Sequence, residues 1–261
     1  MRFFEKLLKL PILPKVSTMS QRYTGFTLAE VLITVGIIGI VAEMTIPSLL
    51  FDFQKQQWVT QLQKSYTMFN QALIQLANDY GCPGDLACTD LFASTTPLET
   101  TGDAISSYFK IAKNCSTTAS LGCFSNSVGP NYDGSGTRST TYDSATGQYR
   151  FITADGVSFR ISSFGTNCAT TSYGVNSLSL VCGYMYIDVN GLNKPNNKGR
   201  DIFFFYISNG KGPLLYPNAG KDMIVGGTSY YWKDNNYCST TNPIGAYCTA
   251  RIIDESWQMK Y

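Results

Sequence analysis

Glu30 is the residue of this sequence whose chemistry most needs an explanation, because it is an acid near the beginning of a long apolar segment. The segment GFTLAEVLITVGIIGIVAEMTIPSLLF extends from Gly25 to Phe51. A carboxylate is costly in hydrocarbon and is retained there only where a partner neutralises it. Glu30 is therefore predicted to pair with a cation.

Histidine is absent from the 261 residues, and this limits the chemistry that the chain can perform. Histidine is the usual general base near neutral pH, a common zinc ligand and the partner of the nucleophile in Ser-His and Cys-His dyads. Most familiar hydrolytic mechanisms are therefore excluded. We expect no catalytic residues and a protein that is not an enzyme.

Eight cysteines all follow the apolar segment. An even set on one side of a membrane segment indicates disulfides in an oxidising compartment, and reduced cytosolic thiols are the alternative. Eight cysteines allow 105 pairings, but short loops lose little entropy on closure. The spacing therefore favours four local pairs and leaves other pairings open: Cys82 with Cys88, Cys115 with Cys123, Cys168 with Cys182, and Cys238 with Cys248.

A second group of polar side chains lies in the loop IDVNGLNKPNNKGRD, residues 187–201. Asp188, Asn190, Asn193 and Asp201 place oxygen atoms around a turn that contains glycine, and oxygen ligands suit Ca²⁺. The spacing is not that of an EF-hand, because Asn193 stands where that loop has glycine. A turn rich in Asn and Asp between two strands is the alternative interpretation.

These side chains must be positioned by a membrane segment and a head that follows it. The apolar run from Phe26 to Leu50 has the length of about 20 residues that a bilayer crossing requires. The 25 residues before it contain one acid and five basic side chains: Arg2, Lys6, Lys9, Lys15 and Arg22. The positive-inside rule therefore places this leader in the cytoplasm and the remainder outside. A secretory signal is the alternative, but no A-x-A-like cleavage site follows the run.

The residues after the membrane segment have the spacing of an amphipathic helix. Their apolar side chains recur at steps of seven, four and three and form one stripe: Phe51, Trp58, Leu62, Tyr66, Phe69, Leu73, Leu76 and Tyr80. Gly81 is a plausible C-terminal cap. Residues 26–80 are therefore predicted to form one helix, which bends or unwinds most readily between Gly39 and Pro47.

The head, residues 82–261, is predicted to contain helices and an antiparallel sheet. Helical spacing covers residues 103–114, and residues 127–147 form a polar, glycine-rich loop. Residues 154–156 form the turn of a β-hairpin. The tail, residues 249–261, fits a short helix or an edge strand. The strands are predicted at residues 148–153, 157–163, 180–189 and 201–208.

The segment GFTLAEVLITVGIIGIVAEMTIP strongly resembles the N-terminal processing signature of type IV pilins and of type II secretion pseudopilins. The resemblance implies that a prepilin peptidase cuts between Gly25 and Phe26 and methylates the new amine. It also implies that Glu30 is the carboxylate of the motif, and that Gly39 and Pro47 are the glycine and the helix-breaking proline that family members carry. The implied fold is α+β and pilin-like, with a long N-terminal helix packed on an antiparallel head.

Four regions follow from this resemblance: the leader 1–25, the transmembrane half-helix 26–50, the amphipathic half-helix 51–81 and the disulfide-bearing head 82–261. Family leaders are often short, and Met19 offers an alternative start. Some pilins and pseudopilins bind calcium in the head, which would make Ca²⁺ the one cofactor of this chain.

Cleavage would explain Glu30 physically, because it creates a cationic amine on Phe26. In a stack of identical subunits, Glu30 of one chain can pair with Phe26 of the next, and charge neutralisation then fixes the register. A glutamate at the membrane surface with no assembly role is the alternative.

The expected function is therefore that of a structural subunit assembled into a type IV pilus or related filament. A type II secretion pseudopilin is the first alternative, and a membrane-anchored adhesin or enzyme is a remote one.

The expected location is the bacterial inner membrane, which the chain crosses once, with a cytoplasmic N-terminus and a periplasmic head. After assembly, the expected location is a periplasmic or extracellular filament. The expected partners are the prepilin peptidase, other pilin subunits and the pilus or secretion machinery. Nucleic-acid binding is not expected, because the part after the leader has no basic stripe.

Overall fold

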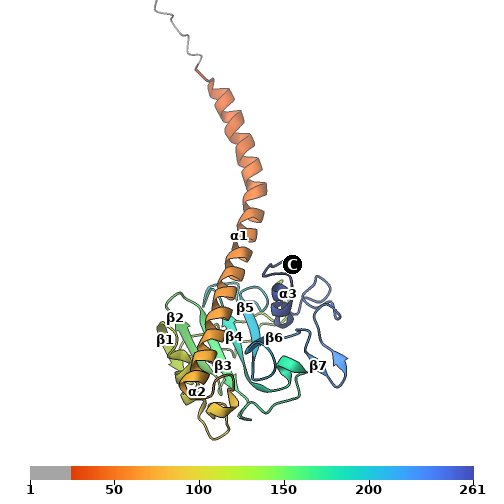
Figure 1. Cartoon of the computed structure of the whole chain (residues 1–261). Coiled ribbons are helices and arrows are strands. Elements are labelled where there is room, and N and C mark those ends of the chain that lie inside the picture. Colours follow the sequence, from red (N-terminus) through yellow and green to blue (C-terminus); the bar gives the residue numbers. More distant parts are fainter. Residues whose placement is uncertain (1–24) are drawn as a thin grey trace, which may run out of the picture. The chain divides into compact units, whose positions relative to one another are not determined.

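A computed structural model of the chain describes residues 25–261 (Figure 1). Residues 1–24, which include the basic residues of the leader and Met19, lie outside the described residues. The chain divides after Leu49 into an N-terminal unit and a compact unit, residues 50–261. The amphipathic part of the long helix therefore belongs to the same unit as the head.

The long helix, α1, spans Leu28–Asp79, close to the predicted range of 26–80. It ends in a Schellman motif, in which the N–H of Cys82 donates to the carbonyl oxygen of Ala77 at 2.8 Å. Gly81 takes the left-handed conformation that this motif requires, with φ of +73°. The predicted glycine cap is therefore confirmed.

The compact unit contains one six-stranded antiparallel sheet, and its strands follow the chain in the order β1-β2-β3-β4-β5-β6. The fold class is α+β, as predicted, and the four predicted strands and the hairpin are confirmed. A separate two-stranded ribbon contains β7 (Ile224–Val225) and β8 (Thr228–Ser229). The sheet strands are β1 (Ile111–Ser116), β2 (Tyr149–Thr153), β3 (Ser158–Ser163), β4 (Val181–Asp188), β5 (Ile202–Ser208) and β6 (Leu215–Pro217).

The main core lies between the C-terminal part of α1 and one face of the sheet (Figure 1). Leu62, Phe69 and Leu73 of the predicted stripe are fully buried there. They pack with alternate residues of the strands, because successive strand side chains point to opposite faces. The two ends of the stripe lie outside this core: Phe51 is half-buried, and Tyr80, which follows the last residue of α1, is 48% exposed.

The turn of the β-hairpin is tied to α1 by an ion pair. Lys64 Nζ lies 2.7 Å from Asp155 Oδ2. Partial burial raises the pKa of Asp155, but hydrogen bonds from Lys64 and Thr153 outweigh that effect and hold the pKa below its ordinary value. This contact helps to fix the hairpin on the helix.

The prediction of a helix over residues 103–114 is correct for residues 103–106 and wrong for residues 111–114. The helix α2 spans Leu98–Ser106, and residues 111–116 form β1, which pairs with β2 at one edge of the sheet. Pairing with a neighbouring strand outweighs the weak helical spacing of this short run. Gly102 of α2 sits against the ring of Tyr149, and a Cβ on this glycine would lie 2.1 Å from that ring.

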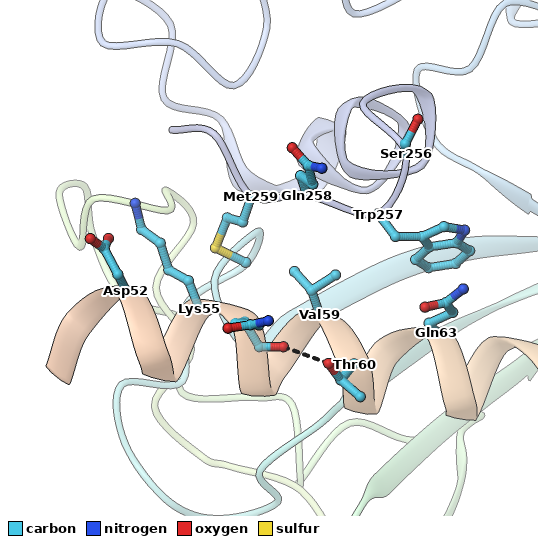
Figure 2. A pocket seen from close by; sticks show the side chains of 10 residues that line it. Asp52, Lys55, Val59, Thr60, Gln63, Ser256, Trp257, Gln258 and Met259 are labelled. Carbon is cyan, nitrogen blue, oxygen red and sulfur yellow. Dashed lines mark hydrogen bonds between the residues drawn. The ribbon is translucent and has the colours of Figure 1, made fainter. Parts of the chain in front are cut away.

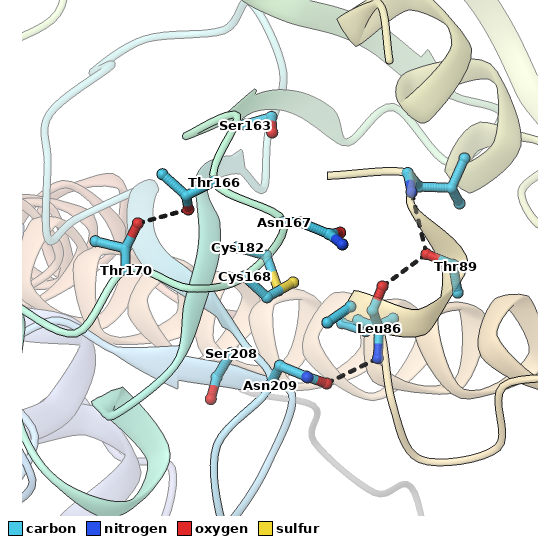
Figure 3. Close-up of a disulfide and its surroundings, with 12 residues drawn as sticks. Leu86, Thr89, Ser163, Thr166, Asn167, Cys168, Thr170, Cys182, Ser208 and Asn209 are labelled. Atoms are coloured by element: carbon cyan, nitrogen blue, oxygen red, sulfur yellow. Dashed lines mark hydrogen bonds between the residues drawn. A yellow bond between two sulfur atoms is a disulfide. The ribbon is translucent and has the colours of Figure 1, made fainter. Parts of the chain in front are cut away.

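Four disulfides close short loops in the compact unit, and they are the local pairs that the spacing favours. Cys168–Cys182 anchors the loop after β3 to β4, close to the bond from Leu86 N–H to Asn209 Oδ1 (Figure 3). Three 3-10 turns, Ala87–Thr89, Asn176–Leu178 and Gly245–Tyr247, complete the connections.

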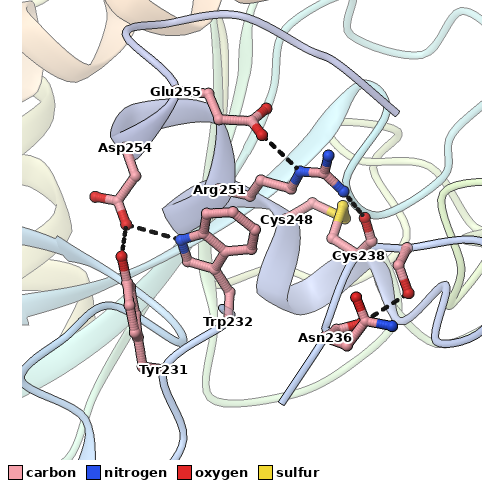
Figure 4. Close-up of polar contacts among 9 residues, drawn as sticks. Tyr231, Trp232, Asn236, Cys238, Cys248, Arg251, Asp254 and Glu255 are labelled. Atoms are coloured by element: carbon pink, nitrogen blue, oxygen red, sulfur yellow. Dashed lines mark hydrogen bonds and ion pairs between the residues drawn. A yellow bond between two sulfur atoms is a disulfide. The ribbon is translucent and has the colours of Figure 1, made fainter. Parts of the chain in front are cut away.

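The tail forms a helix, α3, at Cys248–Asp254 rather than an edge strand. Asp254 Oδ2 accepts hydrogen bonds from the Tyr231 hydroxyl and the Trp232 indole, both at 2.7 Å (Figure 4). Cys238–Cys248 joins the helix to the preceding loop. The C-terminal part of the head is therefore fixed by covalent and polar contacts.

Candidate assembly segment

The first residues of α1 form a capping box. Thr27 precedes the helix, and its N–H and its hydroxyl donate to Glu30 Oε2 at 2.8 Å and 2.9 Å. The N–H of Glu30 donates back to Thr27 Oγ1 at 3.2 Å. These reciprocal bonds satisfy donors that a helix start otherwise leaves unpaired. The T-x-x-E spacing in the sequence is a signal of this role, which the sequence analysis missed.

The same bonds leave part of the Glu30 carboxylate available. Both bonds from Thr27 go to Oε2, and Oε1 accepts no hydrogen bond from the described residues. Phe26, the predicted new N-terminus, is 87% exposed and lies before the helix. Glu30 and Phe26 of one chain are therefore both accessible to another molecule.

The apolar side chains of the N-terminal half of α1 are not covered by the chain itself. Leu28 is 79% exposed, Ile38 is 65% exposed and Leu49 is 70% exposed. This segment is long and apolar enough to cross a membrane, and none of it is buried inside the structure. So large an apolar surface requires a bilayer or other protein chains around it.

Gly39 and Pro47 both lie inside α1, which the structure describes as helical throughout. A Cβ at Gly39 would meet no atom within 4 Å, so packing within the described chain does not require a glycine there. A glycine leaves room for the close approach of a neighbouring helix. The proline removes one backbone donor from the helix ladder. Unwinding between these residues on assembly stays a prediction.

Comparison with known families bears on this segment alone. Residues 20–42 match the family model of the prokaryotic N-terminal methylation motif. The chain carries a prepilin-type methylation motif. No curated protein and no solved structure gives a significant match to the chain.

The motif, the long helix and the antiparallel head together are consistent with the type IV pilin and pseudopilin family. They support a pilin-like or pseudopilin protein that a prepilin peptidase processes. They indicate a structural subunit rather than an enzyme. The apolar helix in this context indicates a membrane-anchored N-terminus.

A groove of about 460 Å³ lies between α1 and the last residues of the chain (Figure 2). Its walls are residues 52–63 of the helix and 256–259 of the tail. Lys55 Nζ donates to the backbone oxygen of Tyr261 at 2.5 Å, which fixes one end of the tail on the helix. The lining is mostly polar. The sequence analysis missed this groove, because it requires the tail and the helix to meet in space.

The predicted metal residues are brought together only in part. Asp188 ends β4, Asp201 precedes β5, and the N–H of Val189 donates to the carbonyl oxygen of Asp201 at 2.9 Å. Asn190 follows in the same turn, whereas the exposed side chain of Asn193 donates to the carbonyl oxygen of Asn190 at 2.9 Å. The prediction that Asn193 is a ligand is therefore not supported by its geometry.

Proposed function

We propose that this chain is a structural subunit whose N-terminal helix packs into the core of a type IV pilus or related filament. The observation that carries the proposal is the uncovered apolar half of α1, which begins with a prepilin-type motif and an accessible carboxylate at Glu30. Packing of identical helices would bury that surface, and the head would form the outside of the filament.

The pairing of Glu30 with the methylated amine of Phe26 from a neighbouring copy supplies the register of the stack. The free Oε1 can accept the charged amine while Oε2 keeps its bonds to Thr27. A charge-assisted bond in a low-dielectric helix core is stronger than one in water. The capping box thus holds the carboxylate in place for the neighbouring subunit.

The proposed topology is a single pass through the bacterial inner membrane. The five basic residues before the apolar segment favour a cytoplasmic leader, and the disulfide-bonded unit favours a periplasmic head. The prepilin peptidase would act at the cytoplasmic surface, and the pilus or secretion machinery would then extract the subunit.

The processing step is tested by mass spectrometry of the mature N-terminus. We expect the chain to begin at Phe26 with one methyl group on the amine. Retention of Gly25 would contradict the proposal and would favour a helix that serves only as a tether for an adhesin or an enzyme.

The assembly step is tested by two substitutions of Glu30. Glu30→Gln keeps an oxygen for the capping box and removes the charge, whereas Glu30→Val removes both. We expect both variants to be inserted and cleaved, and neither to enter filaments. Normal filaments from Glu30→Gln would show that the capping box matters and the charge does not.

A type II secretion pseudopilin is the second candidate, because the same motif and exposed helix serve a periplasmic filament equally well. Immuno-electron microscopy distinguishes the two candidates. Long surface fibres that contain this chain indicate a pilus, and short periplasmic filaments with loss of protein secretion on gene deletion indicate a pseudopilus.

A further inference from the structure

A group of buried oxygen atoms without hydrogen-bond partners lies at one end of strands β3, β4 and β5. Asp188 is fully buried, and neither of its carboxylate oxygens has a partner among the described residues. Ser158 Oγ, Asn190 Oδ1 and Asn196 Oδ1 are also buried and unpartnered. Buried polar atoms are normally paired, so a local group of unpaired acceptors points to a ligand.

The strand register and the loop bring these residues together. Ser158 lies directly opposite Asp188 in the antiparallel pair of β3 and β4, where side chains on one face are about 5 Å apart. Asp188 in turn lies opposite Ile202, the residue after Asp201. The N–H of Asn196 donates to Asp201 Oδ2 at 2.7 Å, which holds the loop against this corner.

Within residues 25–261, no side-chain cation forms an ion pair with Asp188. The ion pairs within residues 25–261 are those of Lys64 with Asp155 and of Arg251 with Glu255. Arg160, on the neighbouring strand, lies 4.7 Å above the Tyr142 ring instead.

The other charges near this corner are also directed elsewhere. Lys198 lies over the Tyr142 and Tyr186 rings at 5.3 Å and 5.6 Å. Arg138 Nη1 donates to Asn197 Oδ1 at 2.7 Å. A fully buried carboxylate without a counter-charge is strongly unfavourable.

Burial, and then the negative charge of Asp201, raise the pKa of Asp188 well above its ordinary value. The nearby N–H groups of Asn190 and Gly191 partly offset that rise. Burial also raises the pKa of Asp201 to about 6, against the N–H groups of Asn196 and Asn197.

We propose that Asp188 and Asp201, with the side-chain oxygens of Ser158, Asn190 and Asn196, bind Ca²⁺ at this corner of the sheet. All five side chains offer oxygen, and calcium takes six to eight oxygen ligands in flexible geometry. The sequence contains no histidine and its eight cysteines are disulfide-bonded, so a metal that prefers nitrogen or sulfur is not matched.

A proton does not satisfy this corner as well as a divalent cation does. A proton on Asp188 would remove the charge and add one donor, but only one of the remaining acceptors could receive it. A calcium ion accepts several oxygen ligands at once, and the proposed site offers it the unpartnered oxygens of Asp188, Ser158, Asn190 and Asn196. This set differs from the predicted one, because Asn196 and Ser158 replace Asn193.

Bound calcium would also hold a distant loop on the sheet. The N–H of Gly129 donates to the carbonyl oxygen of Asn196 at 2.9 Å, and the N–H of Lys198 donates to that of Gly129 at 3.0 Å. Gly129 belongs to the long polar loop before β2. Ordering of residues 188–202 by calcium would therefore stabilise this loop as well.

The test uses the purified full chain in detergent, stripped with EGTA and titrated with CaCl₂ or MgCl₂ by isothermal calorimetry. We expect one Ca²⁺ per chain, weaker binding of Mg²⁺, and a melting temperature several degrees higher with calcium. Asp188→Asn and Asn196→Ala should each weaken calcium binding at least tenfold. The matched control Asn193→Ala, in the same loop, should bind as the unchanged protein does.

Two results would overturn the proposal. One is an unchanged protein that binds no calcium and melts at the same temperature with CaCl₂ and with EGTA, which would indicate that a proton or Arg160 satisfies Asp188. The other is an Asp188→Asn variant with unchanged calcium affinity. Neither result depends on filament formation, so this site and the assembly function are tested separately.

Discussion

The packing of the head against α1 can be tested by substitution of two adjacent residues of the helix. Leu73 is fully buried in the main core, and Ile74 is 51% exposed. Replacement of either by alanine removes three carbon atoms, so the pair differs mainly in environment. Only Leu73 should contribute strongly to the stability of the compact unit.

The expected magnitude follows from the burial. A Leu→Ala change in a core costs about 2 to 5 kcal/mol, because the transfer free energy is lost and a cavity remains. For a unit of about 210 residues, each kcal/mol lowers Tm by about 2 to 4 °C. Leu73→Ala should therefore lower Tm by about 4 to 20 °C. Ile74→Ala should change the stability by less than about 0.5 kcal/mol, since exposed positions contribute little and alanine favours helix.

The assay is thermal unfolding of the mature protein in detergent, followed by near-UV circular dichroism. This signal reports the aromatic core around Phe69 and Phe159, whose rings lie 5.7 Å apart, rather than total helix content. Equal losses of Tm in the two variants would refute the assignment of the buried stripe, because the exposed residue would then matter as much as the core residue.

Three further predictions concern the head. Gly102→Ala should destabilise the fold by about 1 to 3 kcal/mol in chemical denaturation, because the new Cβ would overlap the buried Tyr149 ring. That ring cannot move away easily, since its hydroxyl donates a hydrogen bond to Asp103 Oδ1 at 2.6 Å. An unchanged denaturation midpoint would contradict this packing. Joint replacement of Cys168 and Cys182 by alanine should cost about 2 to 4 kcal/mol in the same assay, since the loop between them no longer restricts the unfolded chain. The pKa of Asp155 is lowered in the folded state, so its ionised carboxylate stabilises the fold by less than about 1 kcal/mol. This stabilisation is present above a pH of about 4 and is lost as the pH falls further. Asp155→Asn should flatten the dependence of unfolding free energy on pH in that range, and an unchanged dependence would count against the ion pair.

Features that depend on neighbours along the chain could be predicted from the order of the residues. The motif around Gly25 and Glu30, the helical stripe of α1 and the hairpin turn at Asp155 all have local spacing that predicts their structure. The disulfides follow the same logic, because the loops that close are short. Periodicity and short loop closure are local properties, and they can be read from a single chain.

Features that depend on residues distant in sequence could not be predicted in this way, because they arise from packing. Residues 111–116 form a strand because β2 offers an edge for pairing, although their spacing favours helix. Ser158 lies opposite Asp188 because of the strand register, and Asn196 is buried beside Asp201, to which its N–H donates, whereas Asn193 is exposed. A pattern along the chain can name the residue types of a site, but the burial and the unpaired oxygens that define it arise only when strands and loops pack.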